Sequence, residues 1–176
     1  MFAVVQNGEV RQIIQPDVAF TIGEKQYSAR FIRNATEAER KAAGVYEIIY
    51  GEQKDQRFYW VTGPSYRVNE INQTVEATFT ANAKEIEDKT ETPEGATEPV
   101  TSKGLKSQWI AQTKAAANSQ LAATDWMVIR KAERGVEIPA ETAAERADIL
   151  AKCAAKEAAI TAATTVEELI AAVTQA

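Results

Sequence analysis

The chain has 176 residues, of which 45% are hydrophobic and 26% charged, a balance typical of one ordinary folded domain or two small ones. Its net charge of −5 disfavours nucleic acid as a partner, because binding to phosphate requires a basic face. The sequence contains no run of about 18 apolar residues, so no membrane span is expected. The N-terminal sequence MFAVVQNGEV lacks the basic start and the apolar core of a secretion signal.

The sequence contains no histidine and one cysteine, Cys153. Ser-His and Cys-His catalytic arrangements, zinc sites of Cys and His ligands, and an internal disulfide are therefore excluded. A lone cysteine fits a reducing cytoplasm. We expect no catalytic residue, no metal and no cofactor. An enzyme would need a carboxylate-only site in which acids such as Glu47, Asp55 or Glu70 converge in a pocket.

Residues 1–81 read as a small antiparallel β-rich module. Asn7-Gly8 predicts a tight turn between strands at 2–6 and 9–14, because both central residues of such a turn need a positive φ. A second hairpin with a loop at 23–25 follows. Thr36 and Glu39 form a capping box that begins one short helix, which Gly44 ends.

Four further strands are expected in this module, at 45–50, 57–62, 66–68 and 74–80, with a turn at Gly63-Pro64. Within the second of these, Phe58, Tyr59 and Trp60 are interpreted as core and cross-strand packing residues. The alternative is that Tyr59, Trp60 and Tyr66 form an exposed aromatic platform for a carbohydrate or a receptor.

Residues 82–103 have two prolines, several acids and almost no large apolar side chain. Such a segment buries too little surface to offset the entropy of ordering, which predicts an extended linker. The alternative is a segment that orders only on a partner.

Residues 104–176 predict an alanine-rich helical domain. A helix at 105–123 is followed by Thr124 as an N-cap, by a helix stop at Gly135 and by a restart at Pro139. Trp126 and Ile129 are expected to face a common core, and Arg130 is spaced to pair with Glu133.

The helix after Pro139 is expected to carry its apolar side on Ala143, Ala147, Leu150, Cys153 or Ala154, and Ala158. A last capping box at Thr165 and Glu168 begins the final helix. Alanines bury little area, so the anchoring must come from the large side chains, which are Trp109, Trp126, Ile129, Leu150 and Ile160. A domain of this kind is stabilised by packing on the β module, by self-association or by docking on a partner.

Two blocks resemble tailed-bacteriophage tail proteins. The first runs from Gln26 to Arg40 and on into Gly44-Val45-Tyr46-Glu47-Ile48, followed by the Arg57-Phe58-Tyr59-Trp60-Val61 strand. It is similar to a small N-terminal module of those proteins. The second, Thr124-Asp125-Trp126 through Arg130 to Arg146, resembles the C-terminal region of tail fibre assembly proteins. It departs from their pattern at Arg146, which follows Glu145 and has no aromatic neighbour.

The resemblance implies a non-enzymatic virion protein of the tail fibre or baseplate region, made in the host cytoplasm, that works by binding other tail proteins or a second copy of itself. It leaves open a fibre assembly chaperone that is absent from the mature particle. The candidate interface residues are Tyr59, Trp60, Tyr66, Trp109, Trp126, Arg130 and Arg146. Neither a membrane nor a nucleic acid is expected as a partner.

Overall fold

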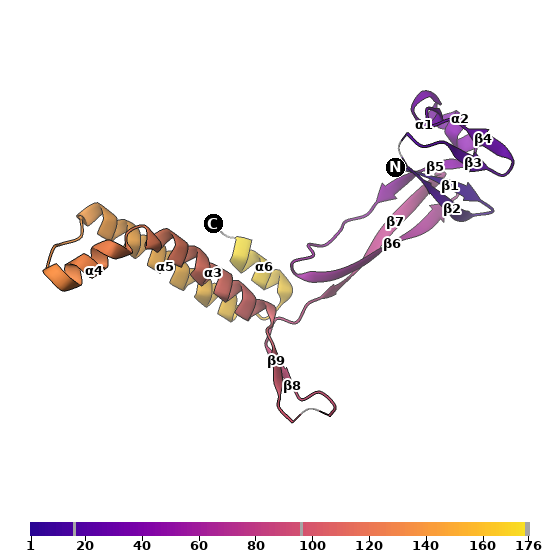
Figure 1. Ribbon diagram of the computed structural model, residues 1–176. Helices are drawn as coiled ribbons and strands as arrows, with labels where there is room; N and C mark the ends of the chain where they lie inside the picture. Colours follow the sequence, from indigo (N-terminus) through magenta and orange to yellow (C-terminus); the bar gives the residue numbers. More distant parts are fainter. Residues whose placement is uncertain (16, 96, 175–176) are drawn as a thin grey trace. The chain divides into compact units, whose positions relative to one another are not determined.

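The computed structural model describes residues 1–15, 17–95 and 97–174. Its contacts divide the chain into two compact units, Met1–Asn82 and Ala83–Ala176. The first unit is built on a sheet and the second on helices, which confirms the expected α+β class (Figure 1).

The first unit contains a five-stranded, curled sheet with the strand order β2-β1-β5-β7-β6. Its strands are β1 (Phe2–Gln6), β2 (Glu9–Ile14), β5 (Val45–Tyr50), β6 (Tyr59–Asn69) and β7 (Thr74–Ala83). β1 pairs antiparallel with β2 and with β5, but β5 and β7 are parallel. The sheet is therefore mixed and not wholly antiparallel as expected, because β6 takes the outer position and β7 returns between β6 and β5.

Each face of this sheet has its own cluster of buried side chains. One cluster contains Ala3, Val5, Tyr46, Ile48, Val75 and Ala77, with Val10, Ile13 and Val68 packed against it. The last three belong to the edge strands β2 and β6, so the curl brings both edges onto one apolar face. The other face buries Val4, Ile14 and Val45 together with two aromatic side chains.

Those aromatic side chains come from the hairpin of β3 (Phe20–Ile22) and β4 (Lys25–Tyr27). The Phe20 and Tyr27 rings stack at 5.2 Å, and Phe31 packs edge-on against Tyr27 at 4.7 Å. Phe31 begins the short helix α1 (Phe31–Asn34), which precedes α2 (Glu37–Ala42). The capping box at the start of α2 is confirmed, but the module has two short helices where one was expected.

The predicted turn at Gly63-Pro64 is wrong, because β6 runs through both residues, which are joined by a cis peptide bond. β6 is an edge strand of the sheet. A proline that lacks an N–H group is tolerated there, since one side of an edge strand has no ladder partner.

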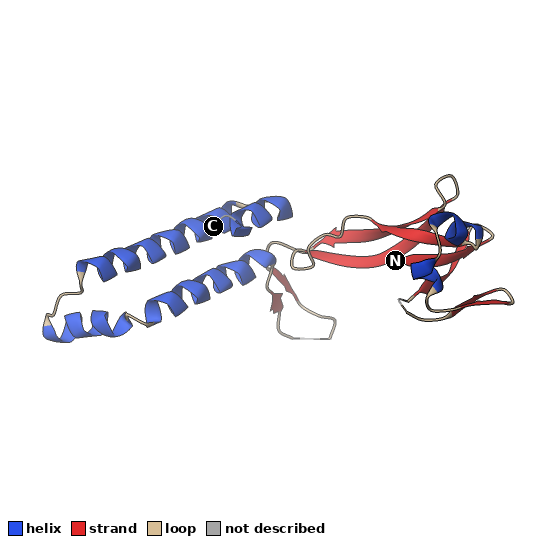
Figure 2. Cartoon of the chain, turned by 90° about the horizontal axis from the view of Figure 1, so that it is seen from above, coloured by secondary structure: helices blue, strands red, loops and turns tan. Residues whose placement is uncertain are grey.

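The second unit begins with a hairpin and continues as helices. The elements are β8 (Lys89–Glu91), β9 (Val100–Ser102), α3 (Leu105–Ala122), α4 (Asp125–Arg134), α5 (Ala140–Ala162) and α6 (Val166–Thr174). α3 and α5 lie side by side, and α6 packs on α5 (Figure 2). Gly135 ends α4 with a φ of 66°, as the sequence predicted. The predicted capping box of α6 is also present: the Glu168 amide donates to Thr165 Oγ1, and the Thr165 amide donates to Glu168 Oε2.

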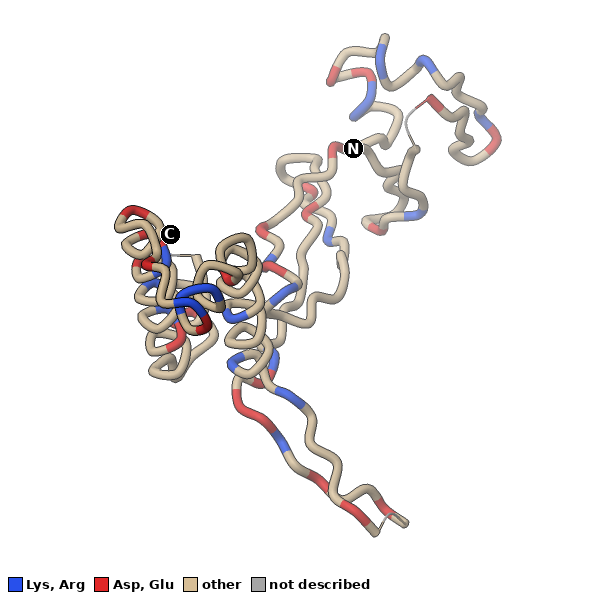
Figure 3. The backbone as a smooth tube through the Cα atoms, turned by 60° about the vertical axis from the view of Figure 1, so that its left-hand side comes forward, with Lys and Arg blue, Asp and Glu red and all other residues tan. Residues whose placement is uncertain are grey.

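The segment predicted as an extended linker, 82–103, contains the β8–β9 hairpin instead. The Thr90 and Thr101 hydroxyls meet across the two strands at 2.8 Å. Every described residue of the hairpin is exposed, and acidic residues outnumber basic ones along it (Figure 3). The segment buries little surface, as its composition predicts, but β8 and β9 pair with each other without a core.

The start of α3 is fastened to the chain that precedes the hairpin. The Leu105 and Lys106 amides donate to the carbonyl oxygens of Glu85 and Ile86, each at 3.0 Å. The Gly104 amide donates to Asp88 Oδ1 at 2.8 Å. Amides that a helix leaves unpaired at its N-terminus are satisfied in this way by neighbouring backbone and a carboxylate.

Candidate protein-binding surfaces

The aromatic run Phe58-Tyr59-Trp60, which leads into β6, divides between core and surface. Phe58 and Tyr59 are buried, with Tyr59 only 7% exposed, whereas Trp60 is 64% exposed. Core packing is therefore confirmed for Phe58 and Tyr59 but wrong for Trp60, and Tyr59 is removed from the candidate platform. The strand alternates its side chains between two faces, so Tyr59 and Trp60 cannot share one.

Tyr66 belongs to an aromatic cluster that the sequence did not reveal. Tyr50 stacks on Phe79 with ring centroids 6.4 Å apart, and its hydroxyl donates to Met1 Sδ at 3.0 Å. Partial burial, and then the adjacent Tyr66 phenol, raise the pKa of Tyr50. Tyr50 and Tyr66 are both exposed at the end of this cluster. One sequence pattern pointed to part of this cluster: Tyr46, Ile48 and Tyr50 alternate along β5, which places all three side chains on one face of that strand.

Trp126 is not a core residue. It is 51% exposed and Ile129 is 57% exposed, and α4 contains no buried residue. The expected common core is therefore wrong. Periodicity identified an apolar side of α4 correctly, but no other element within the described residues covers that side.

Arg130 lies over the Trp126 indole, with its guanidinium carbon 4.8 Å from the ring centroid. Its Nε is shielded from solvent and has no hydrogen-bond partner among the described residues. The expected pairing with Glu133 is replaced by this cation–π contact, which is worth roughly 0.5–1 kcal/mol at an exposed site. Trp126, Ile129 and Arg130 together form what we call the α4 patch.

Arg146 is not a surface charge but a clamp within the second unit. Its side chain is 15% exposed. It donates to the Leu121 carbonyl oxygen at 2.9 Å, to Thr124 Oγ1 at 2.5 Å and to Asp125 Oδ1 at 2.8 Å. Thr124 consequently uses its hydroxyl on Leu121 and Arg146 and makes no side-chain cap to α4. Arg146 of α5 thereby holds the junction between α3 and α4.

Trp109 is half-buried and lines a shallow groove of about 360 Å³ between α3 and α5, with Ile149 and Cys153 on the α5 side. The Cys153 thiol donates to Glu157 Oε1 at 3.2 Å. This bond, burial and the Glu157 charge raise the pKa of Cys153. The raised pKa favours the protonated thiol, which is the unreactive form of a cysteine.

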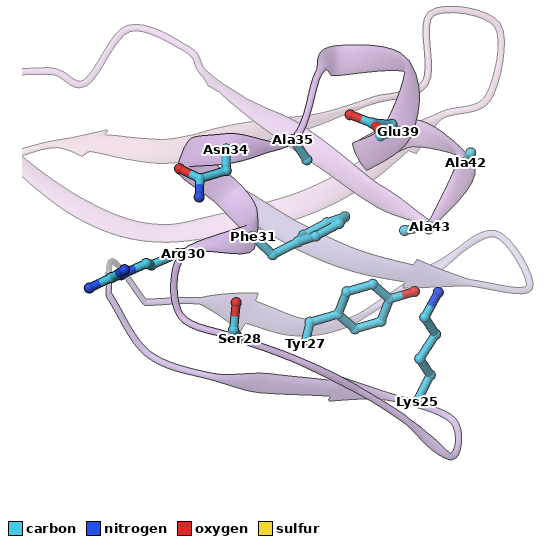
Figure 4. Close-up of a pocket in the computed structure, with 10 residues that line it drawn as sticks. All are labelled: Lys25, Tyr27, Ser28, Arg30, Phe31, Asn34, Ala35, Glu39, Ala42 and Ala43. Carbon is cyan, nitrogen blue, oxygen red and sulfur yellow. The ribbon is translucent and has the colours of Figure 1, made fainter.

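The first unit contains a cavity of about 590 Å³ beside α1 and α2. Figure 4 shows the Tyr27 and Phe31 rings across its centre and Arg30 directed away from Lys25. The only carboxylate in its wall, Glu39, accepts bonds from the Thr36 amide and hydroxyl. The Thr36 backbone bond, and then its hydroxyl, lower the pKa of Glu39, so this carboxylate acts as a helix cap.

The candidate acids are absent from the walls of the cavities described for residues 1–15, 17–95 and 97–174. The cavity beside α1 and α2, the groove between α3 and α5, the hollow along β2 and β6 and the hollow between α5 and α6 each have at most one carboxylate in the wall, and none of them is lined by Glu47, Asp55 or Glu70. Asp55 binds Arg57 through two hydrogen bonds of 2.9 and 2.6 Å. Among the described residues no group of His, Cys, Asp and Glu is placed to hold a metal ion.

No helix over the described ranges is both long and apolar enough to cross a membrane. The chain matches no protein-family model, no curated protein and no solved structure. Its candidate surfaces therefore have to be judged on their own geometry.

Proposed function

We propose that this chain is a non-enzymatic structural protein of a bacteriophage tail, located near the fibres or the baseplate, that binds other tail proteins through the α4 patch. The phage assignment rests on the sequence resemblance. The binding role is carried by one observation: a tryptophan and an isoleucine are exposed together on a helix with no buried residue, and a half-buried arginine lies over the tryptophan ring.

The composition of the patch favours protein binding. Tryptophan and arginine are the residue types that most often dominate interface energies, particularly where an apolar ring becomes fully desolvated. Arg130 already lies on the Trp126 ring, so part of the side-chain ordering that binding requires is in place before a partner arrives.

The test uses co-expression with the fibre and baseplate proteins encoded beside this chain, followed by affinity capture and measurement of the dissociation constant. Trp126→Ala is expected to weaken binding by about thirtyfold or more, the effect of losing about 2 kcal/mol at a hot spot. Because Trp126 is half-exposed, the same change should alter the free energy of unfolding by only about 1 kcal/mol.

Trp60→Ala is the matched control, since it removes an equally large exposed indole from the other unit. It should leave binding to the tail protein unchanged. Failure of the chain to bind any of these tail proteins, or equal effects of the two tryptophan substitutions, would contradict the proposal. Detection of the chain in purified particles by mass spectrometry distinguishes a virion component from an assembly chaperone that is not retained.

A carbohydrate or receptor site is the second candidate, favoured by the exposure of Trp60 and by the cluster of Tyr50 and Tyr66. Stacking on a sugar ring requires exposed aromatic faces, which these residues offer and Tyr59 does not. The test is a titration with host surface polysaccharide that is monitored by tryptophan fluorescence. The fluorescence change on binding should be lost in Trp60→Ala and kept in Trp126→Ala. An unchanged spectrum at saturating polysaccharide would dismiss this candidate.

A further inference from the structure

The cavity beside α1 and α2 is large enough for a small-molecule ligand. Its volume of about 590 Å³ falls in the range of roughly 300–1,000 Å³ that such sites occupy. Three parts of the first unit form its wall: β4 with the turn that follows it, α1, and α2 with its C-terminal end. The α4 patch belongs to the other unit, so the proposed protein binding gives this cavity no role.

The apolar part of the wall is formed before any ligand binds. The Tyr27 ring is 8% exposed and contacts Phe20 at 5.2 Å and Phe31 at 4.7 Å between ring centroids. Phe31 is half-buried, and Ala35 and Ala43 extend the apolar surface beside it. Rings that are already fixed lose little conformational freedom on binding. Such a surface accepts the apolar C–H face of a sugar ring.

Two cations in the wall lack a carboxylate partner. Lys25 Nζ lies 4.9 Å from the centroid of the Tyr27 ring, and Arg30 precedes the first residue of α1. Over residues 1–15, 17–95 and 97–174 neither side chain forms an ion pair. The wall contains one carboxylate, Glu39, so two cations and one anion give it a charge of +1 in a chain whose net charge is −5. The cavity therefore favours an anionic ligand.

The two cations lie at opposite ends of the cavity. Figure 4 shows Lys25 at the hydroxyl end of the Tyr27 ring and Arg30 at the other end, directed away from it. Cations that diverge in this way cannot clamp a single phosphate or sulfate between them. They fit a longer ligand whose carboxylates are spaced along its length.

The wall also offers polar groups that the fold does not use. Ser28 and Asn34 are exposed on the same side of the cavity as Arg30 (Figure 4). In the part of the chain that the structure describes, neither the Ser28 hydroxyl nor the Asn34 side-chain amide forms a hydrogen bond. A hydroxyl and an amide each donate and accept, which matches the hydroxyl groups of a sugar.

We propose that this cavity binds an acidic oligosaccharide whose carboxylates pair with Lys25 at one end and with Arg30 at the other. Ser28 and Asn34 bond hydroxyl groups of the sugar units, and one sugar ring packs on Phe31. An acidic peptide fits less well. Extended peptides add a strand to a sheet edge, but alternate residues of β4, Lys25 and Tyr27, line the cavity, so β4 presents a face to it and not an edge.

The site is separate from the exposed aromatic side chains of the sheet. Trp60, Tyr50 and Tyr66 are absent from the wall of this cavity. The inference rests on the first unit alone and does not depend on the proposed tail function.

Isothermal titration calorimetry of the full chain with trigalacturonate, at low ionic strength, tests the site. The methyl ester of the same trisaccharide is the matched probe, because it keeps the sugar rings and removes the charges. Trigalacturonate should bind at least about tenfold more tightly than the ester, the effect of two charge-assisted contacts. No binding of trigalacturonate at millimolar concentration, or equal affinity for the ester, overturns the proposal.

Substitutions of the two cations locate the binding. Lys25→Met and Arg30→Gln should each raise the Kd by about three- to tenfold, as expected for one exposed ionic contact. Arg33→Gln is the matched control, since Arg33 is an exposed arginine of α1 that pairs with Asp17 at 2.6 Å and does not line the cavity. It should leave the Kd unchanged. Equal effects of Arg30→Gln and Arg33→Gln, or loss of binding in Trp60→Ala, overturn the assignment to this cavity.

A steric pair of variants leaves every charge in place. Ala42→Trp adds a ring to the wall from α2 and should abolish binding, whereas Ala38→Trp adds the same ring to an exposed position of α2 outside the wall and should not. Wild-type affinity in Ala42→Trp contradicts the proposal. Tetraglutamate is the last probe: binding as tight as that of trigalacturonate, with the same loss in Lys25→Met, overturns the sugar in favour of an acidic peptide.

Discussion

Replacing Arg146 with alanine is the sharpest test of how the second unit is held together. The guanidinium makes three hydrogen bonds within the second unit, to Leu121, Thr124 and Asp125, while its own side chain is largely buried. No other side chain within the described residues bonds the Leu121 carbonyl oxygen together with the first residues of α4. We expect Arg146→Ala to loosen the α3–α4 junction against α5.

The magnitude follows from the acceptors. Asp125 is more than half exposed, so its ion pair contributes only about 0–1 kcal/mol after solvent screening. The bonds to Leu121 and Thr124 are charge-assisted and partly buried, and their loss costs about 2–3 kcal/mol, although the Leu121 carbonyl oxygen keeps the Thr124 amide and hydroxyl as donors. The expected total is about 2–4 kcal/mol, which corresponds to a fall in the unfolding midpoint of roughly 10 °C or more for a unit of this size.

The assay is urea and thermal unfolding of the full chain, followed by far-ultraviolet circular dichroism, together with hydrogen exchange of α3 and α5. Arg146→Lys retains the charge but not the forked geometry and should fall between wild type and alanine. Arg134→Ala removes an exposed arginine from α4 and should change stability by no more than about 1 kcal/mol. An unfolding midpoint for Arg146→Ala equal to that of Arg134→Ala would refute the clamp.

Three further outcomes are expected. Gly104→Ala should destabilise the second unit by about 2 kcal/mol or more in thermal unfolding, because a Cβ at Gly104 would overlap the backbone that precedes β8. The side chain of Ser107, and then the Gly104 amide, lower the pKa of Asp88. Because the folded pKa is depressed, this carboxylate stabilises the fold above its unfolded pKa of about 4, and the stabilisation is lost as the pH falls through the folded value. Asp88→Asn should therefore flatten the acid limb of the stability profile. Glu157→Gln should lower the raised pKa of Cys153 and speed its reaction with a disulfide reagent at a given alkaline pH; an unchanged rate would contradict the bond between them.

Local chemistry in the sequence determined many of the element boundaries. Asn7-Gly8 has φ of 55° and 74° and joins β1 to β2, because few other residues adopt the left-handed region without strain. Thr36 with Glu39, and Thr165 with Glu168, begin helices for a reason contained in four consecutive residues. Such features are readable because every participating atom lies within one turn of the chain.

Only the tertiary structure decided which apolar side chains are covered. Periodicity predicted that the side of α5 around Leu150 is covered, whereas the structure covers the side around Ile149 and Ile160. The choice depends on Arg146, whose three acceptors lie at the junction of α3 and α4, on Leu121, Thr124 and Asp125. In the same way, Trp126 is exposed because no element of residues 1–15, 17–95 and 97–174 covers its side of α4, and this arrangement cannot be read from the local sequence.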